Sequence, residues 1–398
     1  MLPELLAPAG NLEKLIWAEK YGADAVYFGM KNFSLRNFAG NFSLDDASQG
    51  ISYLHKKGKK AYITLNIYPH SEEFSEIINL AHTLDEMKAD AFIVSDLGLI
   101  CELVKQKIKA KIHISTQANT LNYHTAIVYK KLGASRVNLA RELSLENIKY
   151  IQKNLKDSDI ETEVFIHGAV CFSYSGRCAI SDYLTGFSAN RGECKHPCRW
   201  KYHLVEELRP NEYIPVFEDN RGLYLFNPKE IALFPYVKDI INTGVKSLKI
   251  EGRMKSIHYI ASIVSLYRRI LNNENISIDQ GFSLLARVQN RGYSYGFING
   301  KISNVDYNHD KEKTTSNAVF IGNIIEEKNT NYSIFEVRNK TFAGEKVEIL
   351  EPSGNIFQDI LPNPLFTRDG QYLDYANHGQ YLLLNKKYIP YSIFRRYF

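Results

Sequence analysis

"ELLAPAGNLEKLIWAEKYGADAVYFG", residues 4–29, holds two short apolar segments separated by an amphipathic one. The outer parts, 4–9 and 25–29, have the length and apolar composition of buried β-strands. Between them, apolar residues lie three and four positions apart and the segment stops at Tyr-Gly, which is typical of a helix. The stretch therefore predicts a strand–helix–strand unit with parallel strands.

The same alternation continues to about residue 255. Six further segments have the same β-like composition: 61–66, 91–96, 112–117, 136–141, 162–170 and 245–252. Eight strands with intervening helices in about 250 residues predict a (β/α)8 barrel of the TIM type. A doubly wound open sheet is the alternative, but no GxGxxG motif follows the first strand to support it.

In such a barrel the active site lies at the carboxyl ends of the strands. Each polar residue found there could also be an ordinary cap or loop residue. Together they predict a polar mouth above an apolar barrel, in which Asn66, Gln117 and Arg141 bind substrate. The full set is Asn66, Asp96, Thr116, Gln117, Asn119, Arg141, His167, Glu251 and Arg253.

The chain changes character near residue 300. We expect a barrel domain at 1–299, closed by the helix "KSIHYIASIVSLYRRILNN" and carrying a cysteine-rich insertion at 171–230. Residues 300–317 are polar and indicate a linker. From 318 to 398, short strands separated by Gly, Asn and Pro turns predict a small all-β barrel domain.

Composition places the chain among ordinary globular proteins, with 44% hydrophobic residues and a net charge of +5. The sequence opens without a signal-peptide pattern, and it has no run of about eighteen uncharged apolar residues that could span a membrane. We therefore expect a cytoplasmic protein, in a reducing compartment where clustered thiols bind metal more often than they form disulfides.

Four of the five cysteines are clustered, with the spacing C-x6-C, fifteen residues, C-x3-C. Cys171, Cys178, Cys194 and Cys198 suit a tetrahedral zinc site or an iron–sulfur cluster. The six-residue gap is wider than zinc ribbons use, which favours the cluster. Inert thiols, or a cysteine nucleophile with His167 or His196 as its base, remain open. Cys101 lies on the apolar side of a predicted helix, so we expect it to be buried.

Residues 163–181, "EVFIHGAVCFSYSGRCAIS", resemble the signature of the collagenase-like peptidase family U32. Four other segments resemble blocks of that family in the same order: "PAGNLEKLIWAEKYGADAVYFG", "NRGECKHPCRWKY", "PVFEDNRGLYLFNPKEI" and "SLKIEGRMKS". The resemblance covers about residues 3–300, and the β-rich tail resembles a domain that many members append.

Members of this family are often described as proteases, whereas others are oxygen-independent hydroxylases of a tRNA wobble uridine, a ribosomal RNA cytidine or a quinone ring. The chain is most similar to the tRNA branch. The resemblance implies C5 hydroxylation of the wobble uridine in the tRNA anticodon stem-loop, with a 4Fe–4S cluster and with prephenate, a dicarboxylate, as co-substrate. Many relatives carry a ligand cysteine where this chain has Ala232.

A protease remains the alternative, although the sequence lacks HExxH, DTG and DSG motifs. RNA binding is favoured by "CRWKY" (198–202), in which Arg199, Trp200 and Lys201 could contact phosphate and stack on bases. The terminal "YSIFRRYF" has a similar composition. An amphipathic surface would explain both segments equally well, and a pure RNA-binding scaffold is a third class.

The end of the eighth strand, "KIEGRMKS", brings charge to the mouth. Arg253 can hold a carboxylate or phosphate with two parallel hydrogen bonds, so we expect it to bind the anionic co-substrate or an RNA phosphate, with Lys255 in support. Glu251 and His167 are candidates for proton transfer. A structural ion pair between Glu251 and Arg253 is the alternative.

Overall fold

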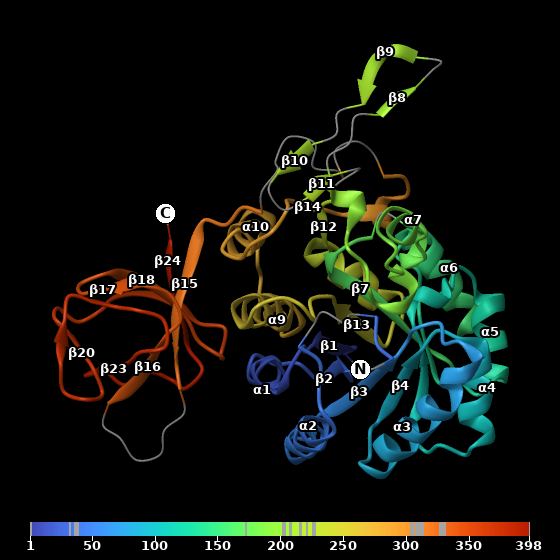
Figure 1. Cartoon of the computed structure of the whole chain (residues 1–398), viewed down its shortest axis with the longest axis horizontal. Helices are drawn as coiled ribbons and strands as arrows, with labels where there is room; N and C mark the ends of the chain where they lie inside the picture. The colour runs from blue at the N-terminus through green and yellow to red at the C-terminus, as the bar shows by residue number, and fades with distance from the viewer. Residues whose placement is uncertain are drawn as a thin grey trace. The chain divides into compact units, whose positions relative to one another are not determined.

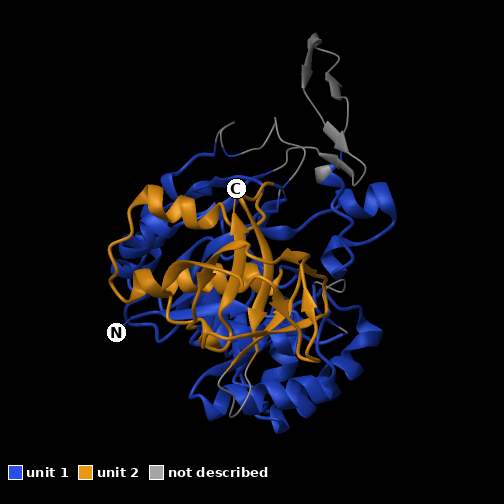
Figure 2. Ribbon diagram, turned by 90° about the vertical axis from the view of Figure 1, so that its left-hand side faces the viewer, with its two compact units in different colours: residues 1–19, 23–255, 291–314 blue, residues 20–22, 256–290, 315–398 orange. Residues whose placement is uncertain are grey.

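The computed structural model of the chain is shown in Figure 1. It describes residues 2–31, 33–35, 40–171, 173–200, 204–206, 209–214, 217–219, 222–224, 228–302, 306, 314–325 and 332–397. For Arg199 and the described parts of 204–224 it gives the backbone alone. Two compact units are coloured in Figure 2: residues 1–19, 23–255 and 291–314 form unit 1, and residues 20–22, 256–290 and 315–398 form unit 2.

Unit 1 contains a closed barrel of eight parallel strands, which confirms the predicted fold and excludes the open sheet. Pairing of β13 with both β1 and β7 closes the cylinder. Helices follow the strands along the chain, and α2 to α6 lie on the outer side of the strands (Figure 1). The strands are β1 (Glu4–Pro8), β2 (Ala25–Gly29), β3 (Lys60–Leu65), β4 (Ala91–Val94), β5 (Lys111–Ile114), β6 (Arg136–Asn138), β7 (Glu161–Ala169) and β13 (Ser247–Ile250). The helices are α1 (Leu12–Lys20), α2 (Leu44–Lys56), α3 (Phe74–Glu86), α4 (Leu97–Lys105), α5 (Tyr123–Lys131), α6 (Leu145–Leu155) and α8 (Val237–Asn242).

Side-chain caps start several of these helices close to the strand ends. Ser43 and Asp46 form a capping box at the start of α2. Asp96, one of the polar residues expected at the mouth, caps α4, where its Oδ1 accepts a hydrogen bond of 2.8 Å from the backbone N–H of Leu99. Asp96 therefore fixes where a helix begins.

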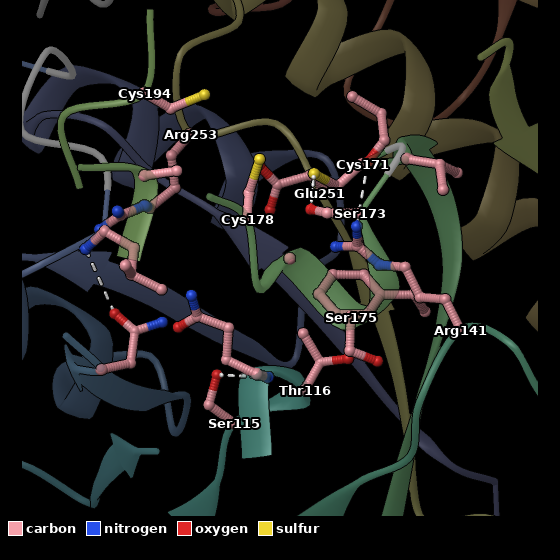
Figure 3. Close-up of a pocket in the computed structure, with 18 of the residues that line it drawn as sticks. Ser115, Thr116, Arg141, Cys171, Ser173, Ser175, Cys178, Cys194, Glu251 and Arg253 are labelled. Carbon is pink, nitrogen blue, oxygen red and sulfur yellow. Dashed lines mark hydrogen bonds between the residues drawn. The ribbon is translucent and has the colours of Figure 1, made fainter. Parts of the chain in front are cut away.

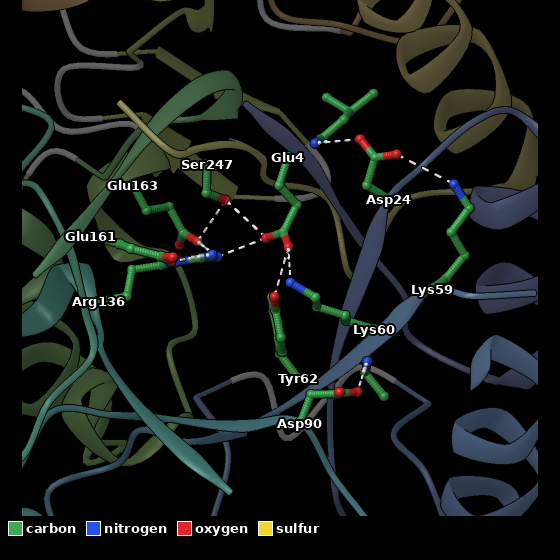
Figure 4. Close-up of polar contacts among 12 residues, drawn as sticks. Glu4, Asp24, Lys59, Lys60, Tyr62, Asp90, Arg136, Glu161, Glu163 and Ser247 are labelled. Atoms are coloured by element: carbon green, nitrogen blue, oxygen red, sulfur yellow. Dashed lines mark hydrogen bonds and ion pairs between the residues drawn. The ribbon is translucent and has the colours of Figure 1, made fainter. Parts of the chain in front are cut away.

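The barrel interior is not the apolar core that the sequence suggested. Glu4, Arg136 and Glu163 meet inside it (Figure 4). Nη1 of Arg136 lies 2.7 Å from Oε1 of Glu4 and 3.5 Å from Oε2 of Glu163. Each residue occupies one of the first three positions of its strand, where a charge normally faces water. Barrel closure brings these three positions together away from solvent.

A cysteine-rich region follows β7. It contains α7 (Ile180–Thr185) and two short antiparallel hairpins, of β8 (Leu204–Glu206) with β9 (Arg209–Ile214) and of β10 (Phe217–Asp219) with β11 (Gly222–Tyr224). The chain then returns as β12 (Glu230–Ala232), which pairs antiparallel with the end of β7. The two-residue strand β14 (Tyr293–Ser294) pairs with β12.

Unit 2 contains the predicted all-β domain and two helices, α9 (Ile257–Leu271) and α10 (Ile278–Leu285). The helix that we expected to close the barrel is α9, which falls in this unit. The main sheet is antiparallel, in the order β19-β18-β24-β15-β16-β23. Its strands are β15 (Ala318–Ile324), β16 (Ser333–Val337), β18 (Lys346–Leu350), β19 (Ile356–Ile360), β23 (Tyr381–Leu384) and β24 (Ile393–Tyr397). Shorter strands complete the domain: β17 (Thr341–Phe342), β20 (Leu365–Phe366), β21 (Tyr372–Leu373) and β22 (Tyr375–Ala376).

Residues 393–397 of the terminal "YSIFRRYF" segment form β24, and the first three of them are buried. Phe394 belongs to the apolar core of the domain. Arg395 is 1% exposed, and its Nε lies 2.6 Å from Oε1 of Glu348. Arg396 is ion-paired with Glu345. The expected basic–aromatic RNA patch is therefore wrong for Arg395, whose guanidinium stabilises the domain instead.

Candidate functional site

A pocket opens at the carboxyl ends of the barrel strands (Figure 3). Figure 3 shows Cys171, Cys178 and Cys194 along one side of it, with Glu251 and Arg253 nearby. The predicted site residues that line this pocket are Asn66, Gln117, Arg141, Glu251, Arg253 and the four clustered cysteines Cys171, Cys178, Cys194 and Cys198. Part of the predicted binding set and the four clustered cysteines thus line one pocket.

Arg253 is a buried cation that donates hydrogen bonds to two side-chain hydroxyl groups. It is 3% exposed, and its Nη1 donates to Oγ of Ser34 at 2.7 Å and to Oγ1 of Thr64 at 3.0 Å. Gly29 makes room for it, because a Cβ at that position would lie 2.1 Å from the same Nη1. These hydroxyl groups position the guanidinium, whose planar fork of N–H donors is suited to an anionic ligand.

Two other groups at the mouth are also oriented by their neighbours. The Tyr27 hydroxyl donates to Oε2 of Glu251 at 3.0 Å, and burial raises the pKa of Tyr27, so it stays a donor. The guanidinium of Arg141 lies 4.0 Å above the ring of Phe165 and donates to the carbonyl of Ala169. Glu251 and Arg141 therefore present a fixed carboxylate and a fixed cation to the same pocket.

The loop that carries the first two cysteines is held by hydrogen bonds to its neighbours. The side-chain amide of Asn190 bonds both backbone groups of Cys178, accepting from its N–H at 3.2 Å and donating to its carbonyl at 3.1 Å. Ser175 has a φ of 48°, a left-handed conformation that is uncommon for serine, and donates through Oγ to Glu142 at 2.7 Å. Such strain at a pocket wall is typical of functional sites.

Arg191 ties the second part of this loop to the barrel. Its guanidinium donates to both carboxylate oxygens of Glu73, at 3.0 and 2.7 Å. The hydrogen bonds from Arg191 lower the pKa of Glu73 to about 2. The bidentate pair therefore stays ionised over the whole physiological range.

This pair predicts a pH-dependent stability. Glu73→Gln should lower the free energy of unfolding at pH 7 by about 1 kcal/mol, because it removes a partly buried bidentate ion pair. The folded-state pKa is depressed from 4.5 to about 2, so the contribution is complete above pH 4.5 and disappears as the pH falls towards 2. Thermal unfolding at several pH values measures the difference. Glu72→Gln is the control, since that neighbouring carboxylate is 78% exposed, and an equal effect of both variants would contradict the assignment.

A family model, described as peptidase family U32, matches residues 10–307, and a second, for the C-terminal domain of that family, matches residues 316–395. The chain belongs to peptidase family U32. A U32 relative, tRNA hydroxylation protein P of Escherichia coli (strain K12), is 34% identical, over 89% of this chain and 87% of its own length. Another, tRNA hydroxylation protein P1 of Bacillus subtilis (strain 168), is 34% identical over 99% of this chain and 94% of its own. A collagenase of Porphyromonas gingivalis is 29% identical over 75% and 74%.

The four clustered cysteines of this chain match the ligand set of an iron–sulfur cluster in number and type. All five cysteines of the chain lie in its described part and none forms a disulfide, and four of them line the pocket. Four thiolates are the usual ligands of an iron–sulfur cluster. As the described side chains stand, no three His, Cys, Asp or Glu residues form a group that could hold a metal ion. Ala232 is fully buried on β12 and does not line the pocket, so Cys198 is the fourth thiol available there.

Two other residues that the sequence predicted for the site, His167 and Lys255, do not line the pocket. His167 is fully buried, faces Tyr293 with 5.6 Å between ring centres, and does not line the pocket. Burial lowers the pKa of His167 to about 3, so it is neutral at physiological pH. Lys255 lies 2.7 Å from Oε1 of the buried Glu230. The structure therefore does not bring either residue to the mouth with Glu251 and Arg253.

The "CRWKY" segment is only partly described. Trp200 is half-buried and does not line the pocket, whereas the Arg199 side chain and the whole of Lys201 lie outside the described residues. Cys101 is exposed on α4, so the expectation that it is buried was wrong. Cys101 follows the apolar pattern of α4, but it lies at the edge of the apolar face, where side chains such as Leu97 and Val104 are exposed to water.

The GxSxG pattern of serine hydrolases occurs at 292–296 as "GYSYG". The GxSxG motif works at a sharp turn from a strand into a helix. Here Ser294 lies on the two-residue strand β14 and its Oγ accepts from the backbone N–H of Gly296. The chain then enters a short 3₁₀ turn at Gly296–Asn299, so the required context is missing.

Several pocket residues were not predicted. Lys249, Asn138 and Tyr27 line its lower part, inside the barrel. Strand periodicity was the signal available for Lys249, because side chains two positions apart share a face and Glu251 was already assigned to the mouth. Asn138 and Tyr27 lie within strands that otherwise read as apolar, and nothing in their local sequence marks them as part of a site.

The chain gives no sign of a membrane-crossing helix in its described part. None of the helices there combines the necessary length with sufficient apolar character.

Proposed function

We propose that this chain is a tRNA hydroxylase of the cytoplasm. It converts the C5–H bond of the wobble uridine to C5–OH without O2, taking the oxygen atom at the oxidation level of water and releasing two protons and two electrons to a separate electron acceptor. It uses prephenate as co-substrate, and Cys171, Cys178, Cys194 and Cys198 would hold a 4Fe–4S cluster. Support comes from the two relatives named as tRNA hydroxylation proteins, which match nearly the whole chain at 34% identity. The tRNA anticodon stem-loop is the macromolecular partner.

One observation carries this proposal: four thiols line the same barrel pocket as Arg141, Glu251 and Arg253. A protease needs one thiol and one base, so it would leave most of this set without a role. A redox enzyme for an anionic co-substrate needs a cofactor site beside fixed cations. The cluster would supply electron-transfer chemistry at this pocket when bound.

The side chains of the pocket then have separate tasks. Arg253, fixed by Ser34 and Thr64, binds a carboxylate of the co-substrate. Glu251 is the carboxylate at the pocket that can accept the proton lost from C5 and is oriented by the Tyr27 hydroxyl. A uridine in an anticodon loop is already partly unstacked, which lowers the cost of turning its base into such a pocket.

A second candidate, a cysteine protease, is favoured by one contact. Sγ of Cys194 lies 3.8 Å from Nδ1 of His196, and both residues line the pocket. This pair has the composition of a thiol nucleophile and its base. It would use one of the four thiols and leave Arg253 without a purpose.

Both candidates can be compared in one experiment. The chain, purified without air, is incubated with tRNA and ribosomal RNA that lack the modifications, with prephenate and an electron acceptor, and in parallel with a collagen peptide. Nucleoside mass spectrometry should show hydroxyuridine in the tRNA, and the peptide should stay intact. Cleavage of the peptide that is lost in Cys194→Ser, without RNA hydroxylation, would support the protease. Hydroxycytidine in ribosomal RNA as the only product would move the substrate to that RNA.

A further inference from the structure

Lys249 is a buried cation of the pocket to which the proposed reaction gives no role. It is 4% exposed, and its Nζ lies 2.8 Å from Oε1 of Glu163 and 4.5 Å from the ring centre of Tyr27. An ammonium has three N–H donors. In the part of the chain that the structure describes, Glu163 is the one side chain that accepts from it. Two donors of a buried ammonium therefore lack an acceptor, which is costly unless a ligand provides one.

Glu163 holds this ammonium from inside the barrel. Its carboxylate also accepts from Nδ2 of Asn138 at 2.9 Å and from Oγ of Ser247 at 3.0 Å. Burial raises the pKa of Glu163, but the charges of Lys249 and Arg136 outweigh this effect and hold the pKa below its usual value. The carboxylate stays ionised, and the remaining N–H groups of Lys249 are turned away from it.

Two buried amide oxygens of the pocket need hydrogen-bond donors. Asn138 is 2% exposed and Gln117 is 4% exposed, and both line the pocket. Neither Oδ1 of Asn138 nor Oε1 of Gln117 has a partner within the described residues. Because the nitrogen of Asn138 donates to Glu163, its oxygen is turned away from that carboxylate. A ligand with a hydroxyl group beside its acid group would satisfy these oxygens and Lys249 together.

We propose that Lys249 is a specificity-determining residue that binds one carboxylate of the co-substrate while Arg253 binds the other. The pocket then selects a hydroxyl-bearing dicarboxylate over a monocarboxylate. Of the Arg, Lys, Asp and Glu side chains that line the pocket, Arg141, Lys249 and Arg253 are cationic and Glu251 is anionic, which favours an anion. The inference rests on the proposed function, in which prephenate is the co-substrate.

Calorimetric titration of the full chain, purified without air, tests this assignment with two probes. Prephenate has two carboxylates and a ring hydroxyl, whereas phenylpyruvate has one carboxylate and no ring hydroxyl. Wild type should prefer prephenate. Lys249→Met should weaken prephenate binding by about 10- to 100-fold, since a charged hydrogen bond is lost, and leave phenylpyruvate binding within about threefold.

Two further variants separate binding from folding. Lys149→Met removes the same charge from an exposed side chain on α6 that does not line the pocket, and should keep the preference. The double variant Glu163→Gln/Lys249→Met leaves no unpaired carboxylate in the barrel, so it should fold and still lack the preference. Retained preference in folded Lys249→Met would overturn the Lys249 assignment alone. Equal binding of both probes by wild type would overturn it together with the proposed co-substrate.

Discussion

Replacing Cys171 with serine is expected to remove most of the iron from the purified chain and to abolish its visible absorbance. The hydroxylated uridine formed per chain should fall at least about 100-fold. The reason is that a serine hydroxyl is a harder and far less acidic ligand than a thiol, and the cluster needs thiolates. Iron and labile-sulfide assays after purification without air, with an absorbance spectrum, measure the first effect.

Cys101→Ser is the matched control for this variant. Cys101 is exposed on α4 and does not line the pocket, so its replacement should leave iron, absorbance and activity unchanged. A Cys171→Ser chain that keeps its full iron content and spectrum would contradict the assignment of this thiol as a ligand. Equal losses in both variants would point to general oxidation damage.

Arg136→Met is expected to cost about 3–5 kcal/mol of the free energy of unfolding, the largest stability effect that we predict. Arg136 is 4% exposed and bonded to Glu4 and Glu161 at 2.7 Å each (Figure 4). Its removal leaves Glu4 and Glu163 in the barrel with less compensating charge. Urea denaturation followed by tryptophan fluorescence measures the loss, because Trp17 is buried on α1.

Lys149→Met provides the comparison. Its ion pair with Glu146 is on the surface of α6, so the change should stay below about 1 kcal/mol. Adding Glu4→Gln to Arg136→Met should recover part of the loss, because it removes one of the interior carboxylates that Arg136 no longer compensates. An Arg136→Met chain within about 1 kcal/mol of wild type would show that the interior network contributes little.

The barrel was predictable from the sequence, but the strand ends were not. Three predicted strands, 91–96, 112–117 and 136–141, end two or three residues earlier in the structure, at Val94, Ile114 and Asn138. The apolar or alternating pattern of each segment does not mark where the strand stops, so pattern alone extends each strand into the following loop. Four of the surplus residues line the pocket: Ser115, Thr116, Gln117 and Arg141.

His167 shows why one predicted residue does not reach the pocket. Side chains alternate along β7, and Phe165, two positions earlier, lines the pocket. The pairing of β7 with β13 shifts register between Lys249 and Ile250, so that Phe165 pairs with Lys249 but His167 pairs with Ile250. One extra residue, Ile166, thus reverses the alternation. Such a bulge depends on the partner strand and leaves no mark in the local sequence.

The hydrogen bonds that hold the cysteine loop were equally beyond prediction. Asn190 bonds Cys178 across twelve positions, and Arg191 reaches Glu73 over 118 positions of the chain. The spacing of the cysteines shows that four thiols can meet, but not which side chains fix them. These contacts form only after the barrel has placed its loops side by side.

The central claim is that this pocket hydroxylates the wobble uridine of tRNA. Its most direct test is nucleoside mass spectrometry of tRNA from a strain that lacks the gene, carrying either the wild-type chain or Arg253→Met. We expect hydroxyuridine to be absent from the deletion strain, restored by the wild-type chain, and not restored by Arg253→Met present at an equal level with equal iron. Unchanged hydroxyuridine in the deletion strain, in a host with no second copy of the enzyme, would contradict it.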